Sequence, residues 1–178
     1  DLRCRIGGSG PLEDALRAQI AELDLGDRVE LTGELLPQER IPEFMAAGHV
    51  YCLPCVWAPD GDVDGLPQML MEAMACGLPA VSTRLVGIPD LIEHEHTGLL
   101  VEPGDVDALA DALERLAGDR ELRHRLAIAG RGRVIETFDL DRCLEPLFRI
   151  FRGGSPPTSP PPRPSEPLSL AAAGDSAR

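Results

Sequence analysis

The chain has 178 residues, 43% of them hydrophobic, and its 30 acidic and 17 basic side chains give a formal net charge of −13. This hydrophobic content supports one domain with a real core, whereas the acidity excludes nucleic acid as a partner, because the phosphate backbone would be repelled. We find no apolar run long enough to span a bilayer and expect no N-terminal signal. Because a strand is expected almost from residue 1, we expect the sequence to be part of a longer protein.

Hydrophobic periodicity predicts strands that alternate with helices. The expected order begins with strand 2–6, helix 12–23, strand 28–33, helix 37–47, strand 50–53 and a long loop 54–66 rich in Asp, Pro and Gly. It continues with helix 67–76, strand 80–83, a short helical turn 87–92 and strand 99–101. The remaining helices are expected from a cap at Asp105 to Leu116, over 122–129 and over 138–151.

This alternation predicts an α/β fold, a Rossmann-like parallel sheet with helices on both faces, because helices between parallel strands form right-handed crossovers. We assign residues 1–152 to this domain. Residues 153–178 are rich in Pro, Ser, Ala and Gly and carry few charges, so we expect a disordered tail that cannot bury enough apolar surface to offset its chain entropy. The alternative for the tail is that its Pro-Pro repeats dock a proline-reading module.

The five cysteines argue against a disulfide framework, because their number is odd, and favour a reducing cytosol. Cys52 and Cys55 have the spacing of a redox or zinc pair. However, Cys52 lies in the apolar strand 50–53, and no second pair or histidine follows at finger spacing. We therefore interpret both as buried thiols, with the redox or zinc pair as the alternative.

Four loops follow predicted strands, and in parallel sheets ligands bind beyond the carboxyl ends of the strands. We expect these loops to gather at one edge: Gly8–Gly10, Gly33–Leu36, Pro54–Leu66 and Arg84–Pro89. The first is a glycine turn, which is weak evidence for phosphate binding, because such a turn also lets a helix pack close to a strand.

The stretch from Asp60 to Pro79 is the strongest candidate for a functional site. Asp64 ends a loop, and a helix with Glu72 as its one carboxylate follows. Because this helix is apolar on nearly every face, we expect Glu72 to be buried and to need an Arg, backbone donors or ligand hydroxyls as partners. The free N–H groups at the helix start attract phosphate. The arrangement suits a sugar nucleotide, and a structural salt bridge from Glu72 to Arg84 or another Arg is the alternative.

A set of motifs in this order resembles the C-terminal domain of retaining GT-B glycosyltransferases of family 4. The motifs are Gly8-Ser9-Gly10-Pro11, Leu31-Thr32-Gly33, Asp64 to Glu72, Glu72-Ala73-Met74-Ala75, Gly77-Leu78-Pro79, Gly87-Ile88-Pro89 and Thr97-Gly98-Leu99-Leu100-Val101. Singly they are common, but their order and spacing are specific. The resemblance covers residues 1 to about 152 and implies a nucleotide-sugar donor site, with the acceptor bound by a preceding domain that this sequence lacks.

The resemblance implies roles for individual residues. Asp64, where the family pattern usually has Glu, would hold sugar hydroxyls, and Glu72 would hold the ribose hydroxyls; these are the candidate catalytic residues. The amides around Gly65, Leu66 and Gln68 would meet the sugar and the diphosphate, and Pro67 stands where many members have Gly. Further donor-binding candidates are the turn residues Gly8 and Gly10, and Leu35 and Leu36, which would contact the base.

Members of this family need no bound metal, because a basic pair and a helix dipole stabilise the diphosphate. That basic pair lies upstream of residue 1. We expect no cofactor here, with the nucleoside-diphosphate sugar as co-substrate. His94 and His96, with Glu93 and Glu95, are read as a solvated loop, and a metal site is the alternative.

The function expected is the donor-binding part of a retaining glycosyltransferase, which transfers a sugar from a nucleoside-diphosphate sugar to an acceptor. One alternative is a non-catalytic nucleotide-binding fragment, which an apolar patch along Leu144, Phe148 and Phe151 would support. A GT-B nucleotide-sugar epimerase is a weaker alternative, because epimerases lack the paired acids. We expect the full protein to be cytoplasmic, at the inner face of the membrane, with peripheral membrane association arising from the absent half.

Overall fold

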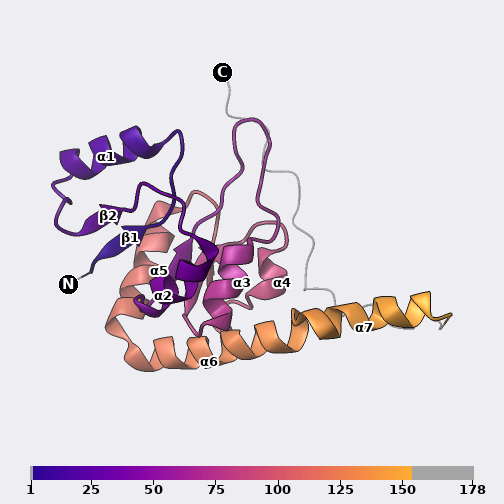
Figure 1. The fold of residues 1–178 in the computed structure, drawn as a ribbon. Helices are drawn as coiled ribbons and strands as arrows, with labels where there is room; N and C mark the ends of the chain where they lie inside the picture. Colours follow the sequence, from indigo (N-terminus) through magenta and orange to yellow (C-terminus); the bar gives the residue numbers. More distant parts are fainter. Residues whose placement is uncertain (1, 154–178) are drawn as a thin grey trace, which may run out of the picture. The chain divides into compact units, whose positions relative to one another are not determined.

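The structure, a computed structural model, describes residues 2–153, and the chain divides into two compact units with the boundary between Ala47 and Gly48. Figure 1 shows the elements of both units, coloured by their position in the sequence. The tail expected from residue 153 onward lies, apart from Gly153, outside the described residues. None of the described helices is long and apolar enough to cross a bilayer.

The first unit contains a two-stranded parallel ladder. In chain order its elements are β1 (Cys4–Ile6), α1 (Glu13–Glu22), β2 (Val29–Leu31), the short 3-10 helix η1 (Gln38–Arg40) and α2 (Ile41–Ala46). Strands β1 and β2 pair so that Arg5 lies opposite Glu30, and the two side chains form an ion pair of 3.1 Å between Nε and Oε2. The predicted strand, helix, strand and helix of this part are confirmed.

The second unit holds a three-stranded parallel sheet in the order β3-β4-β5. Its elements are β3 (Tyr51–Leu53), α3 (Gln68–Ala75), β4 (Ala80–Thr83), α4 (Ile88–Leu91), β5 (Leu99–Val101), α5 (Val106–Gly118), α6 (Arg120–Thr137) and α7 (Leu140–Phe151). Asp105, Asp119 and Asp139 cap the last three helices, each carboxylate accepting a backbone N–H of the first turn. The cap at Asp105 was predicted.

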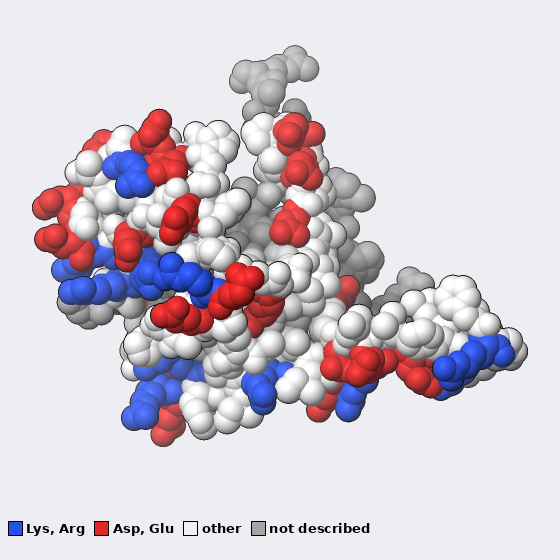
Figure 2. Space-filling view, viewed as in Figure 1, with Lys and Arg blue, Asp and Glu red and all other residues white. Residues whose placement is uncertain are grey.

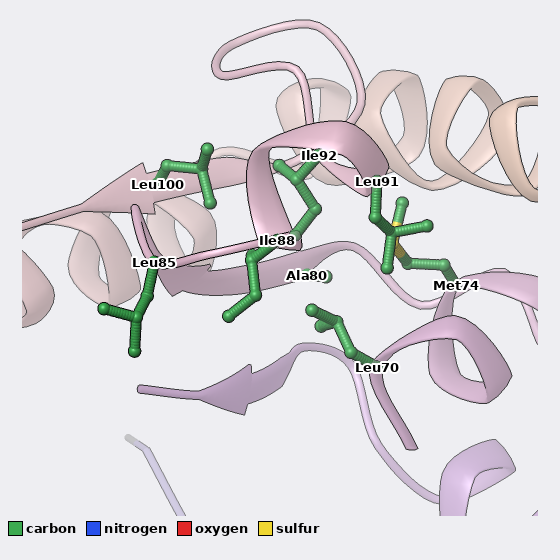
Figure 3. Close-up of a cluster of buried hydrophobic side chains, with 8 residues drawn as sticks. All are labelled: Leu70, Met74, Ala80, Leu85, Ile88, Leu91, Ile92 and Leu100. Atoms are coloured by element: carbon green, nitrogen blue, oxygen red, sulfur yellow. The ribbon is translucent and has the colours of Figure 1, made fainter. Parts of the chain in front are cut away.

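Helices cover both faces of this sheet, as the sequence predicts, because neighbouring strand residues point to opposite sides. Ala80 and Leu100 face one cluster, shown in Figure 3. Helices α3 and α4, with the residue that follows α4, contribute Leu70, Met74, Ile88, Leu91 and Ile92 to it. Val81 and Leu99 face the other cluster, to which α5 and α6 contribute Ala112, Leu116, Leu122 and Leu126. The strands are therefore buried on both sides, which is what a parallel sheet requires.

Candidate functional site

The loop of residues 54–66 is attached to the core at both of its ends. At the end next to β3, Thr83 Oγ1 donates to the carbonyl of Cys55 at 2.6 Å. At the end next to α3, the amide of Gly87 donates to the carbonyl of Gly65 at 2.9 Å. A Cβ at Gly87 would lie 2.9 Å from that same oxygen, so the approach requires glycine. The predicted meeting of the loops after β3 and β4 is therefore confirmed.

The loop leads to the start of α3, where two backbone donors have no helical acceptor. Pro67 is the N-cap, and no side chain caps the helix. The amides of Leu70 and Met71 bond to the carbonyl of Pro67 at 3.1 and 3.4 Å. Among the described residues, nothing accepts from the amides of Gln68 and Met69, and the first turn contains no acidic residue. This helix start therefore presents donors and the positive end of a dipole.

The helix α3 is not buried on nearly every side, and that expectation is wrong. It buries Leu70, Ala73 and Met74 completely, but its opposite face is open, so that Glu72 is only half-buried. The reason is that α3 packs against α6 and the sheet with one face only. A half-buried carboxylate retains access to ligand hydroxyls.

Glu72 is held by a neighbouring side chain rather than by an ion pair. Its Oε1 accepts from Gln68 Nε2 at 3.2 Å, one helical turn earlier. Arg84, the suggested structural partner, instead pairs with Glu102, with 3.2 Å between Nε and Oε1, and no Arg among residues 2–153 forms an ion pair with Glu72. The suggested salt bridge to Arg84 is therefore wrong, and no other Arg among the described residues takes its place. The Gln68 contact was missed, although the four-residue spacing was a signal for it.

The carboxylates of Asp64 and Glu72 affect the acidity of groups beside them. Burial raises the pKa of the Tyr51 phenol to about 12, and the charge of Glu72 adds to this effect. Burial also raises the pKa of the Cys55 thiol, and Asp64 adds to it. Both groups therefore stay neutral beside the two acids. Asp64 is exposed at the end of its loop, so its oxygens are available to a ligand.

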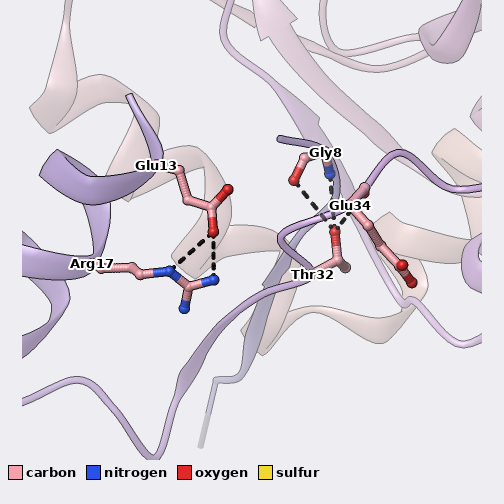
Figure 4. A network of polar contacts seen from close by, with 5 residues as sticks. All are labelled: Gly8, Glu13, Arg17, Thr32 and Glu34. Atoms are coloured by element: carbon pink, nitrogen blue, oxygen red, sulfur yellow. Dashed lines mark hydrogen bonds and ion pairs between the residues drawn. The ribbon is translucent and has the colours of Figure 1, made fainter. Parts of the chain in front are cut away.

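One donor-binding candidate of the first unit, Gly8, lies beside Thr32, as Figure 4 shows. The amide of Gly8 donates to Thr32 Oγ1 at 3.0 Å, and Thr32 Oγ1 is 3.1 Å from the carbonyl of Glu34. The loops after β1 and β2 thus meet, as expected. Thr32 was quoted within a motif, but its bridging role was missed, because such a contact depends on strand pairing.

The leucines and the second turn glycine of this unit have different environments. Leu36 is half-buried, and its Cδ1 would lie 3.6 Å from a Cβ at Gly7. Leu35 is 77% exposed, and Gly10 faces open space. Leu36 therefore lies beside Gly7, just before the turn, whereas Leu35 remains available to a ligand.

The cysteines and histidines form no recognisable ligand set. None of the five cysteines forms a disulfide, and Cys52 and Cys55 are half-buried. Among residues 2–153, no group of three or more His, Cys, Asp or Glu side chains is placed to hold a metal ion. His94 accepts the amide of Leu100 at Nδ1, at 3.0 Å, so this polar loop is anchored to β5.

The fold matches that of solved glycosyltransferases of the GT-B type. A C-terminal domain of a glycosyl transferase group 1 family protein (LpcC) from Francisella tularensis superposes with a TM-score of 0.67 at 22% identity, covering 78% of this chain and 70% of that one. The Anabaena protein Alr3699/HepE, solved in complex with UDP-glucose, superposes with a TM-score of 0.68 at 26% identity, covering 79% and 36%. The fold is therefore that of the C-terminal domain of a GT-B glycosyltransferase.

The family is defined by the sequence. Residues 1–133 match the family described as Glycosyl transferases group 1, and the chain belongs to this family. Among curated relatives, the amylovoran biosynthesis glycosyltransferase AmsK of Erwinia amylovora is 43% identical over 146 residues, which are 82% of this chain and 36% of that protein. The chain spans about a third of the length of the curated relatives that it matches.

Proposed function

We propose that this chain is the donor-binding domain of a glycosyltransferase that transfers a sugar from a nucleoside-diphosphate sugar to an acceptor with retention of anomeric configuration. The observation that carries the proposal is the grouping at α3: the exposed Asp64, the amides of Gln68 and Met69, for which the described residues offer no acceptor, and the half-buried Glu72. Membership of the family and the likeness to a protein solved with UDP-glucose support it.

The roles follow from the chemistry of these groups. An ionised carboxylate only accepts hydrogen bonds, so Asp64 and Glu72 suit hydroxyl donors rather than phosphate. We assign Glu72 to the ribose hydroxyls and Asp64 to the hydroxyls of the transferred sugar. The amides near Gly65, Leu66 and Gln68 suit the diphosphate, whose negative charge grows as the sugar leaves. No metal is assigned to this step.

The first unit is assigned to the remaining part of the donor. The turn with Gly8 and Gly10 is tied to Thr32, which leaves its backbone open to a close ligand approach. Leu35, 77% exposed, suits an apolar contact with the base, and the half-buried Leu36 lies beside Gly7, just before the turn.

Binding of the acceptor is a property that we assign to the full protein. We assign acceptor binding to a preceding domain, so that the isolated chain binds nucleotide without transferring sugar. An exposed apolar face on α7, where Phe148 is 51% and Phe151 83% exposed, is consistent with a surface that the rest of the protein covers. The relatives named for amylovoran and colanic acid biosynthesis support a role in polysaccharide assembly. We place the full protein in the cytoplasm at the inner face of the membrane.

The test is calorimetry of the chain with UDP, GDP and ADP. We expect one of the three to bind, and the variant Glu72→Ala to weaken it by about 10- to 100-fold, because each lost hydrogen bond to a charged group is worth about 1.5–3 kcal/mol. The matched control is Glu114→Ala, which removes an exposed helical glutamate on α5 and leaves the affinity unchanged. Equal affinity of the Glu72→Ala variant and the wild type would contradict the role of Glu72.

A further inference from the structure

The sequence contains one tryptophan, Trp57, which lies in the loop of residues 54–66. Its side chain is 54% exposed, and so is that of the adjacent Val56. The loop is anchored at Cys55 and Gly65, and its tip is closed by hydrogen bonds between Ala58 and Asp62, at 2.9 Å, and between Gly61 and Ala58, at 2.9 Å. Leaving an indole in water on an anchored loop forgoes a large burial free energy. Such exposure is typical of a contact surface.

The charges around Trp57 restrict what it contacts. Asp60, Asp62 and Asp64 follow on the same loop, and all three are exposed. Figure 2 shows acidic side chains along this loop and no basic side chain on it in the face in view. A phosphate would be repelled here. Carboxylates accept hydrogen bonds from hydroxyl groups, so the loop suits a ligand that combines hydroxyls with an apolar face.

The loop also connects directly to the donor site. Asp64 is its last carboxylate, and Val63, between Asp62 and Asp64, packs on the core. Asp60 Oδ1 accepts the amide of Asp62 at 3.1 Å, and Asp62 Oδ1 accepts the amide of Val63 at 2.9 Å, so the second oxygen of each exposed carboxylate is left for a ligand. A sugar ring has hydroxyls on its rim and C–H groups on its faces, and an exposed indole is a flat surface on which such a face stacks.

We propose that Trp57, with Asp60 and Asp62, forms a carbohydrate-binding subsite for a sugar ring of the acceptor, next to the donor site. The proposal rests on the function proposed above, because it takes the reacting sugar to lie at Asp64. It assigns to this domain a share of acceptor recognition. Trp57 stacks on the ring, and the two aspartates accept its hydroxyls.

The experiment is saturation-transfer NMR of the 178-residue chain with lactose, maltose and α-1,6-mannobiose at millimolar concentrations. We expect saturation of ring C–H protons of at least one disaccharide, and quenching of the fluorescence of the sole tryptophan over the same concentration range. Trp57→Ala abolishes the saturation, Trp57→Phe retains part of it, and the double change Asp60→Asn with Asp62→Asn weakens it by about 2- to 10-fold.

The control is Phe151→Ala, which removes a more exposed aromatic side chain, 83% exposed on α7, and leaves the signals unchanged. Absence of both signals with all three disaccharides, or an equal loss in the Phe151→Ala variant, overturns the proposal. So does displacement of the disaccharide by UDP, GDP or ADP, since Trp57 would then belong to the donor site. A dimer that Trp57→Ala dissociates in sedimentation would make the surface a protein interface and also overturn it.

Calorimetry separates this inference from the proposed function. Loss of disaccharide binding in the Trp57→Ala variant with unchanged nucleotide affinity supports the subsite. If the chain bound none of the three nucleotides but still gave a disaccharide signal that depends on Trp57, the proposed donor site would be contradicted. The proposed carbohydrate contact of Trp57 would still be supported.

Discussion

The two units contain the same kinds of element, parallel strands and helices, but they bury their side chains very differently. In residues 48–153 the sheet is covered on both faces by fully buried side chains. Among residues 2–47, Met45 is the one fully buried side chain, and β1 and α1 bury none. Parallel strands alone therefore do not make a core; helices on both faces do.

The first unit relies on polar contacts where the second relies on packing. Its two strands are linked by Arg5 and Glu30, and its two loops by Thr32. In the second unit, polar contacts such as that between Thr83 and Cys55 lie at the edge of a packed core. Exposed ion pairs contribute little stability, so we expect the free energy of unfolding to come mainly from residues 48–153.

The strongest test of this difference is a cavity in each unit. Leu70→Ala removes a fully buried side chain of α3 and should lower the free energy of unfolding by about 2–5 kcal/mol. The matched change Leu16→Ala lies in α1, where no residue is fully buried, and should cost less than about 1 kcal/mol. Urea denaturation of both variants measures the two values. Similar losses would contradict the unequal burial.

A second test sharpens the comparison by showing how local the packing of the second unit is. Gly130 and Gly132 lie in α6, two residues apart, but a Cβ at Gly130 would lie 2.7 Å from the carbonyl of Thr97, whereas one at Gly132 has nothing within 4 Å. Gly130→Ala should therefore destabilise by about 1–3 kcal/mol. Gly132→Ala should stabilise by about 0.4–1 kcal/mol, because alanine favours the helix. Thermal unfolding of the two variants measures whether each change raises or lowers the stability. A stabilising effect of Gly130→Ala would show that small shifts of the neighbouring atoms relieve the clash.

The smallest effect concerns one ion pair in each unit. Arg115 bonds Glu95 through two nitrogens, at 2.7 and 3.1 Å, and this holds the pKa of Glu95 below its usual 4.5. A carboxyl whose folded pKa is lowered stabilises the fold above its unfolded pKa, and this contribution is lost as the pH falls through the folded value. Glu95→Gln should lower the free energy of unfolding by about 0.5 kcal/mol at neutral pH, because solvent screens the pair. At a pH well below 4.5 the change should have no effect on the free energy of unfolding.

The matched variant for this pair is Glu30→Gln, which breaks the cross-strand pair with Arg5. Because 63% of the Glu30 side chain is exposed, we expect this change to lower the free energy of unfolding by no more than about a few tenths of a kcal/mol. Urea titrations of both variants at pH 7 and well below 4.5 provide the comparison. A Glu95→Gln cost that persists at low pH would show that packing, and not charge, is responsible.

The secondary structure was predictable because its signals are local. Alternating apolar residues marked β1, helical spacing marked α1 and α5, and Asp105 marked a cap. The site was predictable in outline for the same reason, since Pro67 with the two acids identified a helix start. The exposure of that helix was not predictable, because it depends on α6, which begins more than forty residues later.

The sequence by itself determined the order of strands and helices, the α/β class and the paired acids Asp64 and Glu72, because these follow from spacing along the chain. Only the tertiary structure decided that Glu72 is half-buried and bonded to Gln68, that Arg84 pairs with Glu102, and that the chain divides after Ala47. The physical reason is that exposure and pairing depend on which distant elements pack together. The exposure of Trp57 was likewise not predictable from the sequence. Its large apolar side chain suggests a core residue, and only the packing of the chain leaves it exposed.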